Sequence, residues 1–133
     1  MSTDNELPTP PAPPSICCGD LYWIAADTAS EPASACAHPH LVVQDDVFNR
    51  SRIASVVVCA LTSNLQRASE PGNVLLAPGE GGLPRQSVIV VSRIDAIDKT
   101  RLGTRIGRLS PQRVAQVLAG LRFQQEAFLG PSR

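Results

Sequence analysis

The apolar residues of this chain come in short runs, and this limits the fold more than any other feature of the sequence. The runs are rich in Val, Ile and Leu, and each is bounded by Gly, Pro, Ser or Asn. Such runs are typical of β-strands, whereas a helix needs a longer segment with apolar positions three or four residues apart. Since a chain of 133 residues is long enough for one core and too short for two ordinary domains, we predict a single, mainly β domain.

Several segments have the composition of strands: 20–25, 40–44, 55–61, 73–77, 87–91 and 106–109. The third of these is apolar enough that we expect it to be buried on both faces, with Cys59 as a small core residue. Residues 78–82, Pro-Gly-Glu-Gly-Gly, predict a turn or mobile loop. Short strands at this spacing suggest a compact, strongly twisted barrel.

One helix is expected, near the end of the chain. Ser110 places a capping hydroxyl before Pro111, and Val114, Val117 and Leu118 then follow at helical spacing. We predict an amphipathic helix over residues 111–128 that covers one face of the sheet, with partner binding as the alternative role.

The ends of the chain differ from its middle. Residues 1–15 are rich in proline and poor in apolar side chains, so we expect a flexible lead-in, then one folded domain over 16–129 and a short tail over 130–133. Residues 27–37 predict a long loop. No run is long enough to cross a bilayer, and the start lacks the pattern of a secretory signal, so we predict a cytoplasmic protein whose four cysteines are mostly free thiols.

The formal net charge is zero, but the charges are unevenly distributed. Up to Pro84 there are three basic and nine acidic residues, a net charge of −6; from Arg85 onward there are nine basic and three acidic residues, a net charge of +6. Two outcomes are open. The halves can pair with each other on folding, or a basic surface can remain for a phosphate backbone or an acidic peptide.

Taken in order, short motifs along the chain resemble the MazF/PemK family of toxins. They are Gly19-Asp20-Leu21-Tyr22-Trp23, Pro39 with residues 41–46 and Phe48-Asn49, Val57-Val58 with Leu61-Thr62-Ser63, Gly82-Leu83 with Ser87-Val88-Ile89, Ile97-Asp98-Lys99 with Arg101-Leu102, and Ile106-Gly107-Arg108-Leu109. Each motif is short, but together they extend from Gly19 to Leu121 in the family's order and spacing.

The resemblance implies both a fold and a function. The fold would be the SH3-like barrel of the MazF, PemK and CcdB toxins, with a C-terminal amphipathic helix, in a homodimer. The function would be that of the toxin of a toxin–antitoxin system: an endoribonuclease that cuts single-stranded RNA at short motifs without a metal or organic cofactor, and so arrests growth. The partners implied are the RNA substrate and a cognate antitoxin with an acidic tail.

The resemblance also implies catalytic residues, and one of them departs from the family pattern. Such an enzyme makes the ribose 2′-hydroxyl attack the adjacent phosphorus, which requires proton transfer and stabilisation of charge on phosphate. The family assigns this work to an arginine before the proline of the second strand and to a threonine after the buried strand. The threonine is Thr62, but His38 stands in place of the arginine. An imidazole is a better proton shuttle than a guanidinium and a poorer phosphate clamp, so we predict His38 and Thr62 as the catalytic residues.

Candidate RNA contacts follow from position along the chain. Ser63, Asn64 and Arg67 come after the threonine, and Arg85 precedes a strand. Ser30-Glu31 resembles the family's Ser-Glu pair but lies farther from the strand, and Glu31 is a further candidate RNA contact.

Two alternatives to the ribonuclease remain open from the sequence. Cys36, His38 and His40 alternate along an extended segment and could hold zinc, with Cys17-Cys18 supplying a further ligand. The chain could also be a weakly active or non-catalytic relative that acts by binding an antitoxin or another protein. The gyrase-poisoning relatives of that class end in Trp-Gly-Ile, whereas this chain ends Gly-Pro-Ser-Arg.

Overall fold

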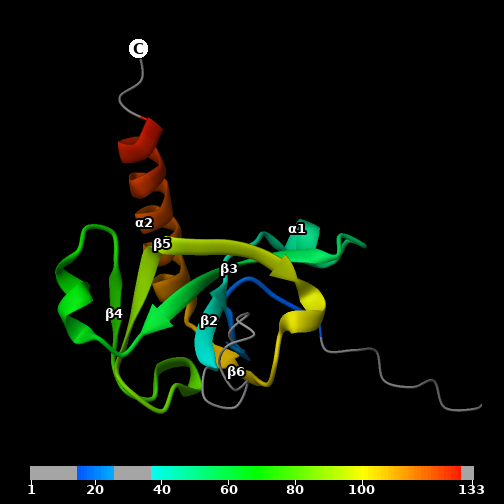
Figure 1. The fold of residues 1–133 in the computed structure, drawn as a ribbon, viewed down its shortest axis with the longest axis horizontal. Helices are drawn as coiled ribbons and strands as arrows, with labels where there is room; N and C mark the ends of the chain where they lie inside the picture. The colour runs from blue at the N-terminus through cyan, green and yellow to red at the C-terminus, as the bar shows by residue number, and fades with distance from the viewer. Residues whose placement is uncertain (1–14, 26–36, 130–133) are drawn as a thin grey trace, which may run out of the picture.

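The computed structural model describes residues 15–25 and 37–129, which form one curved antiparallel sheet and a long helix (Figure 1). The strands are β1 (Asp20–Ile24), β2 (His38–Val42), β3 (Ser55–Thr62), β4 (Val74–Leu76), β5 (Ser87–Asp98) and β6 (Arg105–Arg108). The helices are α1 (Asp46–Asn49) and α2 (Pro111–Leu129), with short 3₁₀ turns η3 (Leu65–Ser69), η4 (Glu80–Gly82) and η5 (Lys99–Arg101).

The strand order across the sheet is β4-β5-β3-β2-β1-β6, and every neighbouring pair is antiparallel. The sheet curls into a half-barrel because β5 is long and bends where it crosses β3. Cys59 pairs with Ile94 but Leu61 pairs with Ile89, so β5 contributes more residues than β3 at this point. Such a bulge increases the local bend and twist. One end of β5 can therefore pair with β4 while both ends pair with β3.

Alternation along the strands gives the sheet two apolar faces. One face packs beneath α2, which lies against β4 and β5, in a cluster that includes Leu21, Leu41, Cys59, Leu61, Ile89, Val91 and Val117. The opposite face carries a second cluster: Tyr22, Ile24, Val42, Val56, Val58 and Ile97. The functional site described below lies on this second face.

Most of the predicted elements are confirmed. All six predicted segments form strands, five of them within about two residues of the expected bounds, and the mainly β half-barrel with a C-terminal helix is the predicted fold. The Ser110 hydroxyl accepts the backbone N–H of Arg113 at 3.3 Å and caps α2 as expected. The prediction was wrong for the strand at 87–91, which continues to Asp98, and it omitted α1 and the three 3₁₀ turns. The predicted lead-in, the loop over 27–36 and the tail lie outside the described residues.

Cys59 is a core residue, as predicted. Its side chain is fully buried, and its thiol donates to the carbonyl oxygen of Val90 at 3.0 Å. Burial raises the pKa of the Cys59 thiol to about 12, because the thiolate would lose its hydration. The group is therefore a neutral, unreactive thiol near pH 7.

Gly120 allows α2 to pack closely against the loop before β4, which gives a test of the packing. A Cβ at Gly120 would overlap the carbonyl oxygen of Gly72 and lie 3.2 Å from Val91. Gly120→Ala should therefore lower the free energy of unfolding by about 1–3 kcal/mol, although alanine favours a helix over glycine by about 1 kcal/mol. Urea unfolding measures the change. The matched control is Ala115→Gly on an exposed position of α2, which should cost about 1 kcal/mol from propensity alone; a more stable Gly120→Ala protein would contradict the packing described.

Candidate active site

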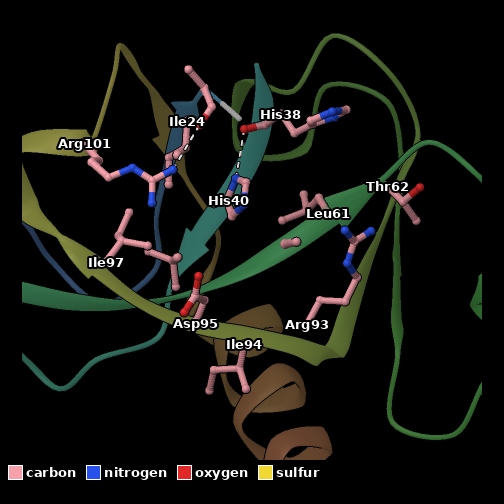
Figure 2. A pocket seen from close by; sticks show the side chains of 13 residues that line it. Ile24, His38, His40, Leu61, Thr62, Arg93, Ile94, Asp95, Ile97 and Arg101 are labelled. Carbon is pink, nitrogen blue, oxygen red and sulfur yellow. Dashed lines mark hydrogen bonds between the residues drawn. The ribbon is translucent and has the colours of Figure 1, made fainter. Parts of the chain in front are cut away.

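A cavity of about 510 Å³ lies on the second face of the sheet (Figure 2). Its walls come from β1, β2, β3, β5 and η5. The lining residues are Ile24, Ala25, His38, His40, Val58, Ala60, Leu61, Thr62, Arg93, Ile94, Asp95, Ile97 and Arg101. Apolar side chains form much of the wall, and the polar groups are two imidazoles, one hydroxyl, two guanidinium groups and one carboxylate.

His38 and Thr62 line this cavity together because of the register between β2 and β3. His40 pairs with Ala60, and Val42 pairs with Val58. The same register continued past His40 sets His38 across from Thr62, on the same face of the sheet. The Oγ1 of Thr62 accepts the backbone N–H of Asn64 at 3.2 Å. That contact uses an acceptor site on the oxygen, so the hydroxyl proton of Thr62 can be donated into the cavity.

His40 is half-buried in the same cavity, and its ring is held by a backbone contact. Its Nδ1 lies 2.9 Å from the carbonyl oxygen of His38 (Figure 2). Burial lowers the pKa of His40 below its ordinary value, and proximity to His38, Arg93 and Arg101 lowers it further, against an opposing effect of the carbonyl contact. His40 is therefore a neutral imidazole near pH 7.

The long strand β5 contributes Arg93 and Asp95, and η5 contributes Arg101. In Figure 2 the Arg93 side chain extends from β5 into the half of the cavity that His38 and Thr62 line. Within residues 15–25 and 37–129, Arg93 has no carboxylate partner. Arg101 donates to the carbonyl oxygen of Ala25 at 3.2 Å. The cavity thus presents positive charge, hydrogen-bond donors and a neutral base, a combination suited to a phosphodiester.

Comparison with known proteins identifies the family. Residues 18–124 match the family model described as PemK-like, MazF-like toxin of type II toxin-antitoxin system. The chain belongs to this family. It is 38% identical over 105 residues to Endoribonuclease MazF6 of Mycobacterium tuberculosis, covering 77% of this chain and 90% of that protein. It is 31% identical over 105 residues to Endoribonuclease EndoA of Bacillus subtilis, covering 79% of this chain and 90% of that one.

Solved structures share the fold. An endoribonuclease from Mycobacterial species superposes with a TM-score of 0.66 at 22% identity, covering 90% of this chain and 96% of the other. A mycobacterial endoribonuclease in complex with its cognate antitoxin superposes with a TM-score of 0.63 at 20% identity, covering 90% and 99%. The predicted fold and the predicted membership of a toxin family with endoribonuclease members are both confirmed.

The uneven charge of this MazF-like toxin is partly paired on folding. Asp20, fully buried, accepts from Arg108 at 2.8 Å and from Arg105 at 3.2 Å. Glu80 accepts from Arg113 at 2.9 Å. These pairs join the acidic first half of the chain to the basic second half. Arg93 has no such carboxylate partner among the described residues, and it is the cation that faces His38 and Thr62.

Four of the remaining predicted site residues lie outside the cavity wall. Ser63 is exposed in the turn after Thr62, and Asn64 caps η3 through its side chain. Arg67 lies in η3 and pairs with Glu70 at 3.0 Å. Arg85 is exposed before β5. Glu31 lies outside the described residues, and the other four stay predictions of RNA contact.

The described residues give the zinc alternative no support. Cys36 lies outside the described residues. In the part of the toxin that the structure describes, no group of three or more His, Cys, Asp or Glu side chains could hold a metal ion. In the same part of the chain, no helix is both long and apolar enough to cross a membrane.

Sequence reasoning missed four polar residues of the cavity in this MazF-like toxin: His40, Arg93, Asp95 and Arg101. His40 was weighed only as a zinc ligand. Arg93 and Asp95 were missed because the strand was expected to end at Val91. The alternation Arg93-Ile94-Asp95-Ala96 is a period-two signal that could have extended it.

Proposed function

We propose that this MazF-like toxin is an endoribonuclease that cuts single-stranded RNA in the cavity lined by His38 and Thr62. The observation that carries the proposal is that three strands bring an imidazole, a hydroxyl and a guanidinium, those of His38, Thr62 and Arg93, to one cavity. These groups can move protons and stabilise a charged phosphate without a metal. The bond cleaved is P–O5′, after attack by the neighbouring 2′-oxygen, and the products are a 2′,3′-cyclic phosphate and a 5′-hydroxyl.

Each group has a role that suits its chemistry. His38 is exposed at the cavity and, as an imidazolium, donates a proton to the departing 5′-oxygen. The hydroxyl group of Thr62 donates a hydrogen bond to a non-bridging phosphate oxygen. Arg93 supplies the charged fork that an imidazole lacks. The family's arginine is thus replaced by two side chains, one for the proton and one for the charge.

Single-stranded RNA is the substrate class that fits such a site. In-line attack requires the 2′-oxygen, the phosphorus and the 5′-oxygen to align, and a regular duplex holds the backbone away from that geometry. Proteins recognise single strands through bases that are splayed out and held in pockets. A cavity of about 510 Å³ has room for an unstacked nucleotide beside the phosphate.

We also propose that the toxin is a cytoplasmic homodimer controlled by a cognate antitoxin with an acidic tail. Support comes from the solved relatives in complex with antitoxins and from apolar side chains left exposed on the described surface. Phe48 is 50% exposed and Ile94 is 48% exposed, and both line a second, largely apolar cavity with Val91 and Leu121. Apolar surface of this kind is typical of protein interfaces. The positive charge of the active-site cavity would attract an acidic tail.

The proposed ribonuclease is tested directly with purified protein. A pool of single-stranded RNA is incubated in chelator with the wild type, His38→Ala and Thr62→Ala. We expect wild-type fragments with 2′,3′-cyclic phosphate and 5′-hydroxyl ends, a loss of about 100-fold for His38→Ala and about 10-fold for Thr62→Ala, and unchanged thermal unfolding of both variants. RNA left intact by the wild type would sink the proposal, and co-purification of a small acidic protein in that case would favour the binding-protein alternative.

A further inference from the structure

We propose that His40 is the general base that removes the 2′-hydroxyl proton, an inference that rests on the proposed ribonuclease function. His40 lies on β2 two residues after His38, and both side chains line the cavity. Alternate residues of a strand point to the same face, and their Cα atoms lie roughly 6.6 Å apart. That spacing lets a phosphate sit between the two rings, with the attacking oxygen facing one ring and the departing oxygen facing the other.

The tautomer of His40 is fixed by the backbone. The carbonyl oxygen of His38 can only accept a hydrogen bond, so the Nδ1 of His40 at 2.9 Å must carry the proton. In the neutral ring, Nε2 then holds the free lone pair. The carbonyl group belongs to a strand and has a fixed position. The hydrogen bond to it therefore fixes the orientation of the ring as well as its tautomer.

The neighbours of His40 leave its ring open to the cavity. On β3, the residue paired with His40 is Ala60, whose methyl group is too small to cover an imidazole. On β1, the paired residue is Tyr22, a buried member of the apolar cluster. Substrate can therefore approach the ring from the side of the cavity.

The charges around the ring favour the state needed for attack. The titratable and charged groups that face His40 are His38 on β2, Tyr22 on β1, Arg93 and Asp95 on β5, and Arg101 on η5. The cavity residues of β3 are all uncharged: Val58, Ala60, Leu61 and Thr62. Burial lowers the pKa of His40 most, and a proton on His38 and the cations of Arg93 and Arg101 lower it further, against the opposing effect of the carbonyl contact. Protonation of His38 therefore favours the neutral form of His40. In that state His38 can act as the acid and His40 as the base.

The proton balance of the step is complete. Nε2 of His40 takes the 2′-hydroxyl proton as the O2′–P bond forms, and the P–O5′ bond breaks as His38 gives its proton to O5′. The products are the 2′,3′-cyclic phosphate and the 5′-hydroxyl, with His40 protonated and His38 neutral. Exchange of protons with solvent restores both rings.

The roles of acid and base are separated by changing the leaving group. An RNA that the wild type cuts is made with sulfur in place of the bridging 5′-oxygen at the cut site, because a thiolate departs without a proton. His40→Gln should lower the cleavage rate by about 100-fold on both the oxygen and the sulfur substrates. His38→Gln, the matched variant, should lose about 100-fold on the oxygen substrate and recover to near the wild-type rate on the sulfur substrate.

The dependence of kcat/KM on pH gives a second test. A variant that only disturbed the structure would not change the shape of this pH profile. The base must be neutral, so wild-type kcat/KM should fall on acidification, with a midpoint below about 6.5, the ordinary pKa of histidine. This acid limb should disappear in His40→Gln. The inference is overturned if His40→Gln cuts RNA within about threefold of the wild-type rate, or if it regains the wild-type rate on the sulfur substrate. It is also overturned if His40→Gln keeps the acid limb of the pH profile and Asp95→Asn removes that limb.

The tautomer of His40 provides a measurement that does not depend on activity. The chain contains 2 histidines, so long-range ¹H–¹⁵N spectra of the wild type, compared with those of His38→Gln, assign each ring. The inference requires a neutral His40 with its proton on Nδ1, and a proton on Nε2 overturns it. Failure of the wild type to cut any RNA overturns the proposed function and this inference together, whereas wild-type cleavage with an Nε2–H ring overturns this inference alone.

Discussion

Replacement of Arg93 by alanine is expected to lower the rate of RNA cleavage by about 100- to 1,000-fold. The loss follows from the position of Arg93 in the cavity wall beside His38 and Thr62, and from the absence of a carboxylate partner within the described residues. A guanidinium that is not already neutralised interacts most strongly with the extra charge that develops on phosphate in the transition state. His38 cannot grip two phosphate oxygens at once, and Arg101, the other guanidinium of the described cavity wall, is held at the carbonyl oxygen of Ala25, so neither replaces the fork of Arg93.

The comparison of two further variants separates charge from geometry. Arg93→Lys keeps the positive charge without the planar fork. We therefore expect it to recover about one tenth to one half of the loss in the logarithm of the cleavage rate that Arg93→Ala causes. Arg52→Ala removes an exposed arginine beyond the opposite end of β3 from Thr62 and should cut RNA at the wild-type rate. Single-turnover rates on one defined RNA measure all three proteins. Equal losses in Arg93→Ala and Arg52→Ala would show that only the net charge of the protein matters.

Local chemistry explains why most of the fold could be predicted from the sequence. Ser110 and Pro111 define the start of α2 without any tertiary contact, because capping and a fixed φ act within one turn. The apolar run of β3 predicts a strand buried on both faces, and its central residues are almost inaccessible to water. The extension of β5 from Ser92 to Asp98 could not be predicted in the same way. Its residues 92–96 are exposed and are held by pairing with β3, as in Val58 with Asp95, rather than by burial.

The candidate site was only partly predictable for the same reason. His38 and Thr62 could be named because both match or replace family positions along the chain. Arg93 enters the site through the bend of β5, which depends on a register shift between two strands that no local pattern specifies. The neutral state of His40 depends on burial and on cations from two other elements, and its tautomer depends on the carbonyl of His38. The position of Arg93 and the surroundings of His40 arise only when the sheet curls. The order of residues along the chain therefore does not predict them.

Replacement of Asp20 by asparagine is expected to lower the free energy of unfolding by about 2–4 kcal/mol. The carboxylate is fully buried at the start of β1, where it accepts the backbone N–H of Cys17 at 3.0 Å and the guanidinium groups of Arg105 and Arg108. Asparagine keeps the size of the side chain but removes the charge, and its NH₂ group cannot accept from either arginine. The two arginines are half-exposed, so water will recover part of the loss.

Urea unfolding of Asp20→Asn should show a lower midpoint with an unchanged slope, since the folded state keeps its compactness. Glu70→Gln is the matched control, because it breaks the exposed pair with Arg67 and should leave the midpoint within error of the wild type. Arg108→Gln should fall between the two, since Asp20 then keeps Arg105 and the N–H of Cys17 as partners. If Asp20→Asn were as stable as Glu70→Gln, the ion pairs between β1 and β6 would contribute nothing to stability. Closure of the sheet at that edge would then depend on backbone pairing alone.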